Sequence, residues 1–265
     1  MKSSMFLFLF LVLCSCQDSG VTSTFAISSD SSIIRGENVE PQSEIAQSSV
    51  VLTTYFEKDG KVVYKSRCSG VLISLRSVLT AAHCFIPDNV EYASSRTYVT
   101  FLVNLENIKG SDSQWIQSWV ANRQYIDGKK DPENDIAIAL LKSDAPSPYK
   151  PAKIARADQV PKPGDFITSA GYGISSEVPR VESNRLKKVQ LRVQGVYYAI
   201  VVVNETDQGS SCFGDSGGPS FIDSEDGLIL YGINVSGRGV NGKHCNQSGS
   251  ILLLSFHRSF IAPYL

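Results

Sequence analysis

Short runs of apolar residues, separated by turn-forming residues, recur along most of the chain. They are rich in Val, Ile, Tyr and Phe, and no helical 3.6-residue period appears before the last residues. The expected strands are 50–56, 62–65, 70–74, 97–103, 136–141, 166–170, 187–193, 197–203, 220–222, 228–234 and 250–255. A short helix is expected over 255–261, because Pro263 then stops it. The pattern predicts an all-β domain.

The first 32 residues depart from this pattern. Lys2 precedes an almost unbroken apolar run over residues 5–14, which is too short to span a bilayer as a helix. Residues 1–16 therefore resemble a secretory signal peptide rather than a buried N-terminal helix. Residues 17–32 are rich in Ser, Asp and Thr, which is typical of a flexible linker or a propeptide. We expect the folded domain to span residues 33–265.

Two cysteines close the apolar run. The segment 13–16 reads LCSC and resembles a bacterial lipobox, in which a small residue precedes the cysteine that is lipidated. Cys16 fits better than Cys14, since a serine precedes it where a bulky leucine precedes Cys14. The alternative is ordinary signal cleavage nearby, without a lipid. In both cases the chain is exported, as a periplasmic or outer-membrane lipoprotein or in secreted form, and meets a membrane only through a lipid on Cys16.

Charge is balanced over the 265 residues. The 25 Lys and Arg residues against 26 Asp and Glu residues give a net charge of −1. No large electrostatic field therefore favours nucleic acid or an anionic membrane as a partner. The hydrophobic share of 42% is that of a globular protein with a substantial core.

Four cysteines remain beyond residue 16, and they suggest disulfides. They are Cys68, Cys84, Cys212 and Cys245. An exported chain meets oxidising conditions, which favour disulfides over free thiols, and four cysteines allow three pairings. No Cys-x-x-Cys pattern and no histidine pair at ligand spacing occurs, so we expect no metal site.

Three short motifs carry residues with catalytic chemistry. Ser216 lies in the segment GDSGGP, whose small residues let two backbone N–H groups converge near the hydroxyl. His83 lies in the segment TAAHC, and Asp135 opens the segment DIAIALL. Together they supply a nucleophile, a base and an orienting carboxylate. Taken singly, His83 also fits a core histidine, and Asp135 fits a turn before a buried strand.

The order of the three motifs and the residues around them resemble the chymotrypsin/trypsin family of serine endopeptidases, from about residue 33 to the C-terminus. The resemblance implies two six-stranded antiparallel β-barrels, at about 33–145 and 160–255, with the active site between them. The proline-rich stretch 143–164 is the expected connection, since prolines break strands. The implied reaction needs no cofactor.

The family's catalytic roles fall on matching residues. His83 would take the proton of the Ser216 hydroxyl, and Asp135 would orient the imidazole. The backbone N–H groups of Gly214 and Ser216 would form the oxyanion hole. The resemblance also implies two disulfides: Cys68–Cys84 and Cys212–Cys245.

Asp215, beside the serine, suggests an activation switch. A carboxylate within this loop is costly if it stays unpaired. In the family, cleavage creates an N-terminal ammonium that inserts and pairs with it, and Ile33 opens a segment, IIRG, that resembles such a terminus. The cut would follow Ser32, which is neither Lys nor Arg and so does not indicate a trypsin-like activator. The alternative is that Ile33 simply begins a first strand.

The substrate pocket is expected at Ser210, Gly237 and Gly249. By distance from Ser216, Ser210 falls where the family's pocket floor lies, and the two glycines leave the slot open. A basic side chain would find no carboxylate at Ser210, so we expect large apolar or aromatic residues before the scissile bond. Arg238, near the wall, is the alternative and would favour an acidic residue.

These features together predict a serine endopeptidase that is made as a zymogen and hydrolyses protein or peptide substrates through an acyl-enzyme. An activating protease and protein inhibitors are its candidate partners. The alternative is a non-catalytic binding protein on the same scaffold, because a fold does not establish activity. Such proteins usually lose a member of the triad, whereas this chain keeps all three. The order His83, Asp135, Ser216 along the chain differs from the Ser, Asp/Glu, His order of esterases with another fold.

Overall fold

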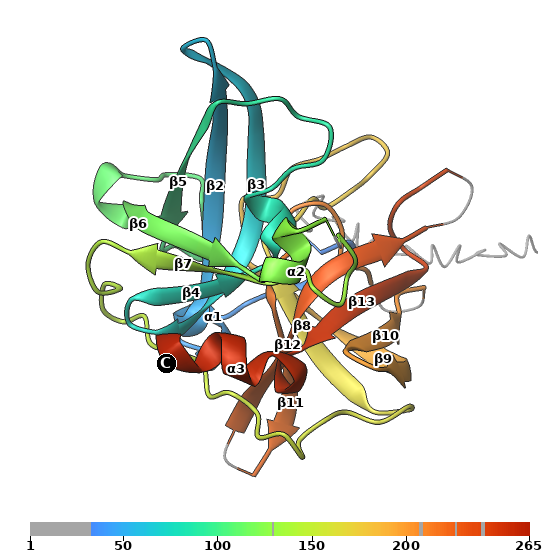
Figure 1. Ribbon diagram of the computed structural model, residues 1–265. Coiled ribbons are helices and arrows are strands. Elements are labelled where there is room, and N and C mark those ends of the chain that lie inside the picture. Colours follow the sequence, from blue (N-terminus) through green and yellow to red (C-terminus); the bar gives the residue numbers. More distant parts are fainter. Residues whose placement is uncertain (1–32, 129, 207–208, 226, 240–241) are drawn as a thin grey trace, which may run out of the picture.

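The computed structural model describes residues 33–128, 130–206, 209–225, 227–239 and 242–265. Within them the chain forms two antiparallel β-barrels that pack side by side (Figure 1). The signal peptide, the linker and the lipidation at Cys16, all expected within 1–32, lie outside the described residues. Among the helices of the described ranges, none has the length and apolar character needed to cross a bilayer.

The first barrel closes in the order β2-β3-β4-β7-β6-β5, and every neighbouring pair is antiparallel. Its strands are β2 (Ser49–Lys58), β3 (Lys61–Ser74), β4 (Ser77–Thr80), β5 (Ser94–Thr100), β6 (Ser113–Ala121) and β7 (Ala137–Leu141). Fully buried aliphatic side chains such as Val50, Leu79 and Ile138 form its core. Burial of each such side chain contributes roughly 1.5–3 kcal/mol, which holds the strands together.

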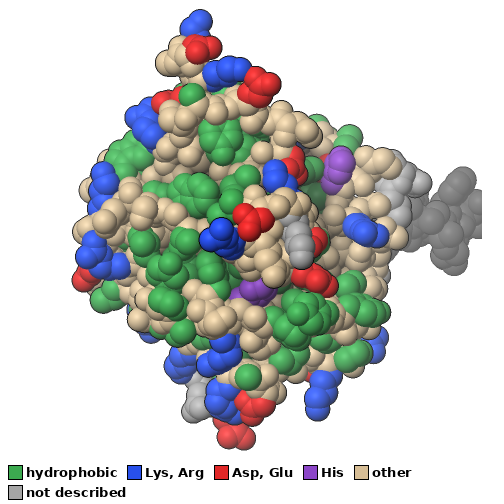
Figure 2. Space-filling view, in the orientation of Figure 1, with side chains coloured by type: hydrophobic (Ala, Val, Ile, Leu, Met, Phe, Trp, Pro, Cys, Tyr) green, Lys and Arg blue, Asp and Glu red, His purple; other side chains and the backbone are tan. Residues whose placement is uncertain are grey.

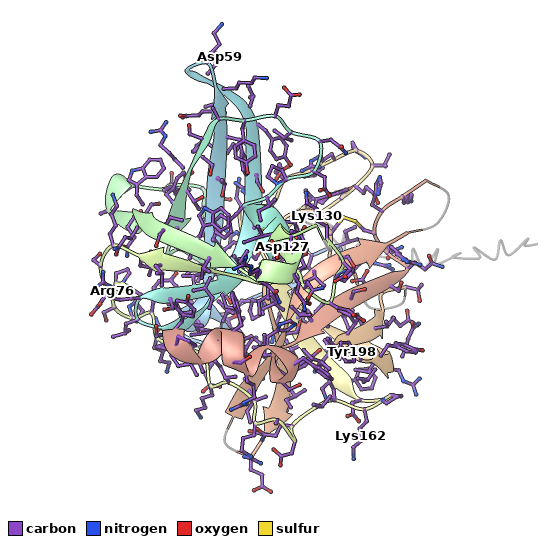
Figure 3. All side chains as sticks on the ribbon, viewed as in Figure 1. Asp59, Arg76, Asp127, Lys130, Lys162 and Tyr198 are labelled. Atoms are coloured by element: carbon purple, nitrogen blue, oxygen red, sulfur yellow. A yellow bond between two sulfur atoms is a disulfide. The ribbon has the colours of Figure 1, made fainter. Side chains whose placement is uncertain are left out.

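A tight turn joins β2 to β3. Asp59 and Gly60 have φ values of 52° and 72°, as a type I′ turn requires, and Asp-Gly is a favoured pair for this turn. The hairpin projects beyond the barrel, and Figure 3 labels Asp59 at its tip. Its second strand returns toward the seam between the barrels, where Tyr64 lines a cleft.

The second barrel closes in the order β8-β9-β10-β13-β12-β11, because β8 pairs with both β9 and β11. Its strands are β8 (Phe166–Gly171), β9 (Lys187–Tyr197), β10 (Ile200–Asn204), β11 (Pro219–Ser224), β12 (Gly227–Arg238) and β13 (Ser248–Leu253). A short strand, β1 (Glu37–Asn38), adds to β9. Along β9 the buried residues Val189, Leu191 and Val193 alternate with exposed polar ones, so one face of the strand lies on the core.

Helices are short in this fold. They are α1 (Glu44–Ser48), η1 (Ala82–Cys84), η2 (Gly110–Asp112), α2 (Arg123–Ile126), η3 (Leu254–His257), α3 (Arg258–Ile261) and η4 (Ala262–Tyr264). The C-terminal segment runs from the second barrel back toward the first (Figure 1), and its Ile261 is buried in the cluster that includes the first barrel's core. This packing anchors the C-terminal helix to the first barrel.

The all-β fold with two six-stranded barrels and a short C-terminal helix is confirmed. Three strands, β1, β4 and β6, were not predicted, and β1 has only two residues. The four residues of β4 are too few to show a pattern, and a bulge between Ile116 and Ser118 breaks the alternation of β6. Residues 142–165, which join the barrels, contain only an isolated bridge at Ile154.

Tyr172 ties the two barrels together. It follows β8 of the second barrel and is fully buried. Its hydroxyl donates to the carbonyl oxygens of Leu102, at 2.9 Å, and Ser49, at 3.4 Å, both in the first barrel. The ring thus fills the seam while its polar end is satisfied by backbone across it.

We predict that Tyr172→Phe lowers the free energy of unfolding by about 1–3 kcal/mol, because it leaves a buried carbonyl without its donor. Urea-induced unfolding measures the change. Tyr197→Phe is the matched control, since this tyrosine is 64% exposed. Equal stability of the two variants would show that the seam does not depend on the Tyr172 hydroxyl.

Candidate active site

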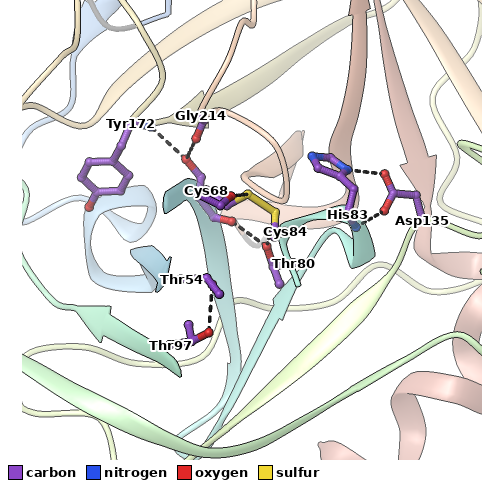
Figure 4. The surroundings of a disulfide bond; sticks show 11 residues. Thr54, Cys68, Thr80, His83, Cys84, Thr97, Asp135, Tyr172 and Gly214 are labelled. Atoms are coloured by element: carbon purple, nitrogen blue, oxygen red, sulfur yellow. Dashed lines mark hydrogen bonds and ion pairs between the residues drawn. A yellow bond between two sulfur atoms is a disulfide. The ribbon is translucent and has the colours of Figure 1, made fainter. Parts of the chain in front are cut away.

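The pairing of β4 with β7 brings His83 and Asp135 together. Thr80 at the end of β4 lies opposite Ala137 at the start of β7, so the residues just beyond these positions are neighbours. Asp135 Oδ2 lies 2.6 Å from His83 Nδ1, and Asp135 Oδ1 accepts a hydrogen bond from His83 N at 2.9 Å (Figure 4). The carboxylate therefore holds both the ring and the backbone of the histidine, and its ionised form selects the tautomer protonated at Nδ1.

The environment of His83 stabilises its protonated form. Burial lowers the pKa of His83, but the negative charge of Asp135 and the hydrogen bond to it outweigh burial. The carboxylate of Asp88 acts in the same direction more weakly. The pKa of His83 therefore lies above its ordinary value, which suits a group that must accept a proton during a reaction.

Ser69, on β3 of the first barrel, binds the loop that carries Ser216 in the second. Ser69 N donates to Ser216 O at 2.9 Å, and the Ser69 hydroxyl donates to Gly214 O at 2.8 Å. The same hydroxyl accepts a hydrogen bond from Tyr172 N at 2.9 Å (Figure 4). Ser69 O accepts from the Thr80 hydroxyl at 2.8 Å, so one residue links the serine loop to the strand before the histidine.

His83 and Ser216 line the same cleft at the seam between the barrels. The cleft has a volume of about 480 Å³, and Ser211 and Gly237 also line it. Lys130, labelled in Figure 3, lines it from the first barrel, where its ammonium pairs with Asp88 at 2.7 Å. The face drawn in Figure 2 carries basic and acidic side chains interspersed rather than gathered by sign. This face therefore shows no large patch of one sign that would attract a strongly charged ligand.

Glycines allow the tight loop around Ser216. Gly217 has a φ of 76°, and a Cβ there would lie only 2.0 Å from Thr80 Oγ1. Gly214 has a φ of 97°, and a Cβ there would lie 2.9 Å from Gly173 Cα. Across the described part of the chain, the N–H groups of Gly214 and Ser216 donate to no protein acceptor. Both donors are therefore available to an oxygen atom of a ligand.

Asp215 is fully buried beneath this loop. Its Oδ1 accepts from Gly173 N at 2.8 Å, and its Oδ2 accepts from Cys212 N at 2.9 Å. Burial raises the pKa of Asp215 to about 7, although these hydrogen bonds oppose the rise. A Cβ on Gly171 would lie 2.2 Å from Asp215 Oδ1, so the carboxylate needs a glycine beside it. The ion pairs among the described residues leave Asp215 without a cation.

Of the three residues expected to form the pocket, Gly237 lines the cleft and the other two do not. Ser210 is fully buried, and Gly249 is buried on β13, next to the strand that carries Gly237. The Ser210 hydroxyl donates to Glu205 Oε2 at 3.1 Å. Arg238 is exposed and is not among the residues that line the cleft. Glu205 was not predicted as a site residue, because no local motif marks a single acidic residue after a strand.

The family model described as Trypsin matches residues 33–251, most of this chain. The chain belongs to the trypsin family. It is accordingly a serine-type endopeptidase. The match to the family model begins at Ile33, where the family resemblance was expected to begin.

Relatives of this trypsin-family chain come from animals and from bacteria. It is 27% identical to human kallikrein-4 over 86% of this chain and 87% of that protein. It is 29% identical to the trypsin of Saccharopolyspora erythraea over 65% of this chain and 76% of the relative. It is 27% identical to rat tissue-type plasminogen activator over 66% of this chain, and spans only 35% of that longer protein.

Two disulfides flank the cleft of this trypsin-family domain, in the pairing that the resemblance implies. Cys68–Cys84 joins β3 to η1, which carries His83, and Cys212–Cys245 joins the serine loop to the segment before β13. The two groups of potential metal ligands in the described residues each include both sulfurs of one disulfide. Such sulfurs are not thiolates, so these groups offer no ordinary metal site.

We predict that Asp135→Asn lowers the pKa of His83, since the variant keeps a polar group but removes the charge that favours the imidazolium. His83 then loses its proton at a lower pH than in the unaltered protein. An NMR titration of the imidazole resonances measures this shift. Asp88→Asn is the control and lowers the pKa less; an equal or larger fall in that variant would contradict the assignment of Asp135 as the main partner.

Proposed function

We propose that His83, Asp135 and Ser216 are the catalytic triad of this endopeptidase. In the proposed reaction, His83 takes the proton of the Ser216 hydroxyl while its oxygen attacks the carbonyl carbon of a peptide bond. The imidazolium then gives this proton to the leaving amine, and an acyl-enzyme remains. Water, activated by the same imidazole, hydrolyses the acyl-enzyme and restores the serine. The observation that carries this proposal is the double hydrogen bond of Asp135 to His83, in the cleft that Ser216 also lines.

The Gly214 and Ser216 N–H groups form the oxyanion hole in this proposal. Attack places negative charge on the former carbonyl oxygen, and donors already oriented toward that position stabilise it. Two observations support this role. The N–H groups of Gly214 and Ser216 have no protein acceptor among the described residues, and Ser69 holds the carbonyl oxygens of the same two residues by hydrogen bonds. Loss of one donor would remove roughly 2.7–4 kcal/mol of transition-state stabilisation.

The precursor is a zymogen in this proposal, and cleavage before Ile33 activates it. Two observations support the idea. Asp215 is buried without a cation among the described residues, and an ammonium would stabilise its charged form. Ile33 has a φ of 49°, an unfavourable value for a β-branched residue, and cutting the preceding peptide bond removes this constraint. Ile33 is also fully buried in the second barrel's core, and the next residue, Ile34, forms an isolated bridge with Ser210, five residues before Asp215.

The proposal also includes export of the protein from the cytosol. Residues 1–16 act as a signal peptide, residues 17–32 as a linker or propeptide, and residues 33–265 as the peptidase domain. A lipid on Cys16 would tether the precursor to a membrane until cleavage frees it. The two disulfides suit an oxidising compartment outside the cytosol. Protein or peptide substrates, an activating protease and protein inhibitors are the partners of such an enzyme.

A serine-directed probe separates a peptidase from a non-catalytic binding protein with the same fold. We predict stoichiometric labelling of the processed protein by a fluorophosphonate, and no labelling of Ser216→Ala. That variant should also lose kcat by on the order of 10⁴–10⁶-fold toward a peptide. The exposed Ser118→Ala is the control and should react like the unaltered protein. Labelling that persists in Ser216→Ala would refute this serine as the nucleophile.

N-terminal sequencing of the active, exported protein tests the activation proposal. We expect the active form to begin at Ile33. A variant with a specific protease site ending at residue 32 should gain peptidase activity only after the cut, because the new ammonium then reaches Asp215. Full activity in a form that begins at Cys16 would contradict the switch.

A further inference from the structure

A buried carboxylate that the proposed mechanism does not use lies behind the cleft. Glu205 directly follows β10 and has no exposed surface. Its Oε1 accepts hydrogen bonds from the Ser211 N–H, at 2.9 Å, and from the Ser211 hydroxyl. Its Oε2 lies 3.1 Å from the Ser210 hydroxyl, whose proton is shared with Ser211 O at 2.7 Å. These donors hold the carboxylate in one orientation.

Strand pairing brings Glu205 to the pocket. In the register of β10 with β13, Val203 lies opposite Gly249, and in that of β12 with β13, Gly237 lies opposite the same glycine. Glu205 is two residues beyond Val203, so its side chain extends beside this row. Glu205 itself lies opposite Gln247, whose carbonyl oxygen accepts from Glu205 N at 3.2 Å, and Gly249 follows two residues after Gln247.

Both glycines leave room for the carboxylate. A Cβ on Gly249 would lie 2.5 Å from Glu205 Oε1, so a side chain there would displace the carboxylate. A Cβ on Gly237 would lie 3.8 Å from Glu205 Oε2, which is ordinary van der Waals contact. Because Gly237 and Ser211 line the cleft, the carboxylate lies immediately behind the cleft wall. Only small groups separate it from a side chain that enters there.

The charge of Glu205 has no cation within the described residues. None of their ion pairs includes it, and its partners are uncharged hydroxyl and N–H groups. Burial raises the pKa of Glu205 to about 6, which hydrogen bonds from Ser211, Ser210 and Asn246 oppose. The carboxylate is therefore largely ionised at neutral pH. The charge of Glu205 is also one of the causes that raise the pKa of Asp215, so this second buried acid offers Glu205 no compensation.

We infer that Glu205 is the specificity-determining residue of this peptidase, and that it pairs with the basic side chain of Lys or Arg before the scissile bond. The inference rests on the proposed function. A bound cation would compensate a charge that the fold leaves unpaired in a place shielded from water. An apolar side chain would leave it unpaired, and an acidic one would be repelled. The expected preference for apolar residues rested on the absence of a carboxylate at Ser210. In the structure, the Ser210 hydroxyl lies beside the carboxylate of Glu205.

Peptide substrates that differ only in the residue before the scissile bond test this inference on the processed protein. We expect kcat/KM to be at least tenfold higher for Lys and Arg than for Phe, Leu or Glu. The isosteric Glu205→Gln should lower kcat/KM for the basic substrates by roughly 30-fold or more, as expected for truncation of one partner of a buried charge pair. Its kcat/KM for the Phe substrate should change by less than about threefold, within what surface substitutions give.

Glu182→Gln is the matched control. It removes the same charge from an exposed position, where the carboxylate pairs with Arg180 at 3.0 Å. We expect it to leave the ratio of Lys to Phe hydrolysis unchanged. A preference of the unaltered protein for Phe or Leu over Lys and Arg would overturn the inference. An equal loss of that ratio in Glu182→Gln would also overturn it, because general electrostatics would then explain the preference.

Two further measurements distinguish a failure of the inference on Glu205 from a failure of the proposed function or of folding. Fluorophosphonate labelling of Ser216 does not depend on the pocket, so a labelled enzyme without basic preference refutes the role of Glu205 alone, whereas an unlabelled enzyme refutes the proposed peptidase site. If Glu205→Gln does not fold, inhibition of the unaltered protein is compared between benzamidinium and neutral benzamide. The cation should bind at least tenfold more tightly, and equal inhibition would overturn the inference.

Discussion

Ser69 provides the contact on which the geometry of the site depends. Ser216, the proposed nucleophile, and His83, the proposed base, belong to different barrels, so their relative position depends on what fixes the seam. Ser69 does so with backbone and side chain together, because it binds both Gly214 and Ser216 in one loop and accepts the Thr80 hydroxyl from the strand before His83. Such bonds between buried groups are short-range and directional, so a small rotation of one barrel would break several at once.

Three buried carboxylates around this seam differ in how their charge is compensated. Asp135 has His83 as a partner in the structure. Asp215 has only backbone donors among the described residues, and the proposed new terminus at Ile33 would supply its cation. Glu205 has only hydroxyl and N–H donors, and in our proposal the substrate supplies the cation. In our proposals, catalysis uses a buried charge that is paired within the fold, whereas activation and specificity use buried charges that the new terminus and the substrate would compensate.

The parts of the site that could be predicted are those that local sequence encodes. Gly214, Gly217 and Gly218 beside Ser216 must lack a side chain, because a Cβ there would clash with neighbouring atoms, and this requirement is visible in the sequence as a motif. Strand β9 was predicted because one face is buried and the other exposed, whereas the bulge in β6 shifts its alternation by one residue. The proximity of Glu205 to Gly249 could not be predicted, because it depends on the pairing of β10 with β13, two strands that lie far apart along the chain.

A crystal structure of the processed enzyme with a peptidyl phosphonate bound to Ser216 tests the central claim most directly. If the Gly214 and Ser216 N–H groups form the oxyanion hole, the phosphonyl oxygen will lie within hydrogen-bond distance, roughly 2.7–3.1 Å, of both nitrogens. We also expect His83 Nε2 beside the modified serine oxygen, with the Ser69 bonds to the loop retained. A structure in which the imidazole stays remote from that oxygen, or the phosphonyl oxygen faces solvent, would contradict the account.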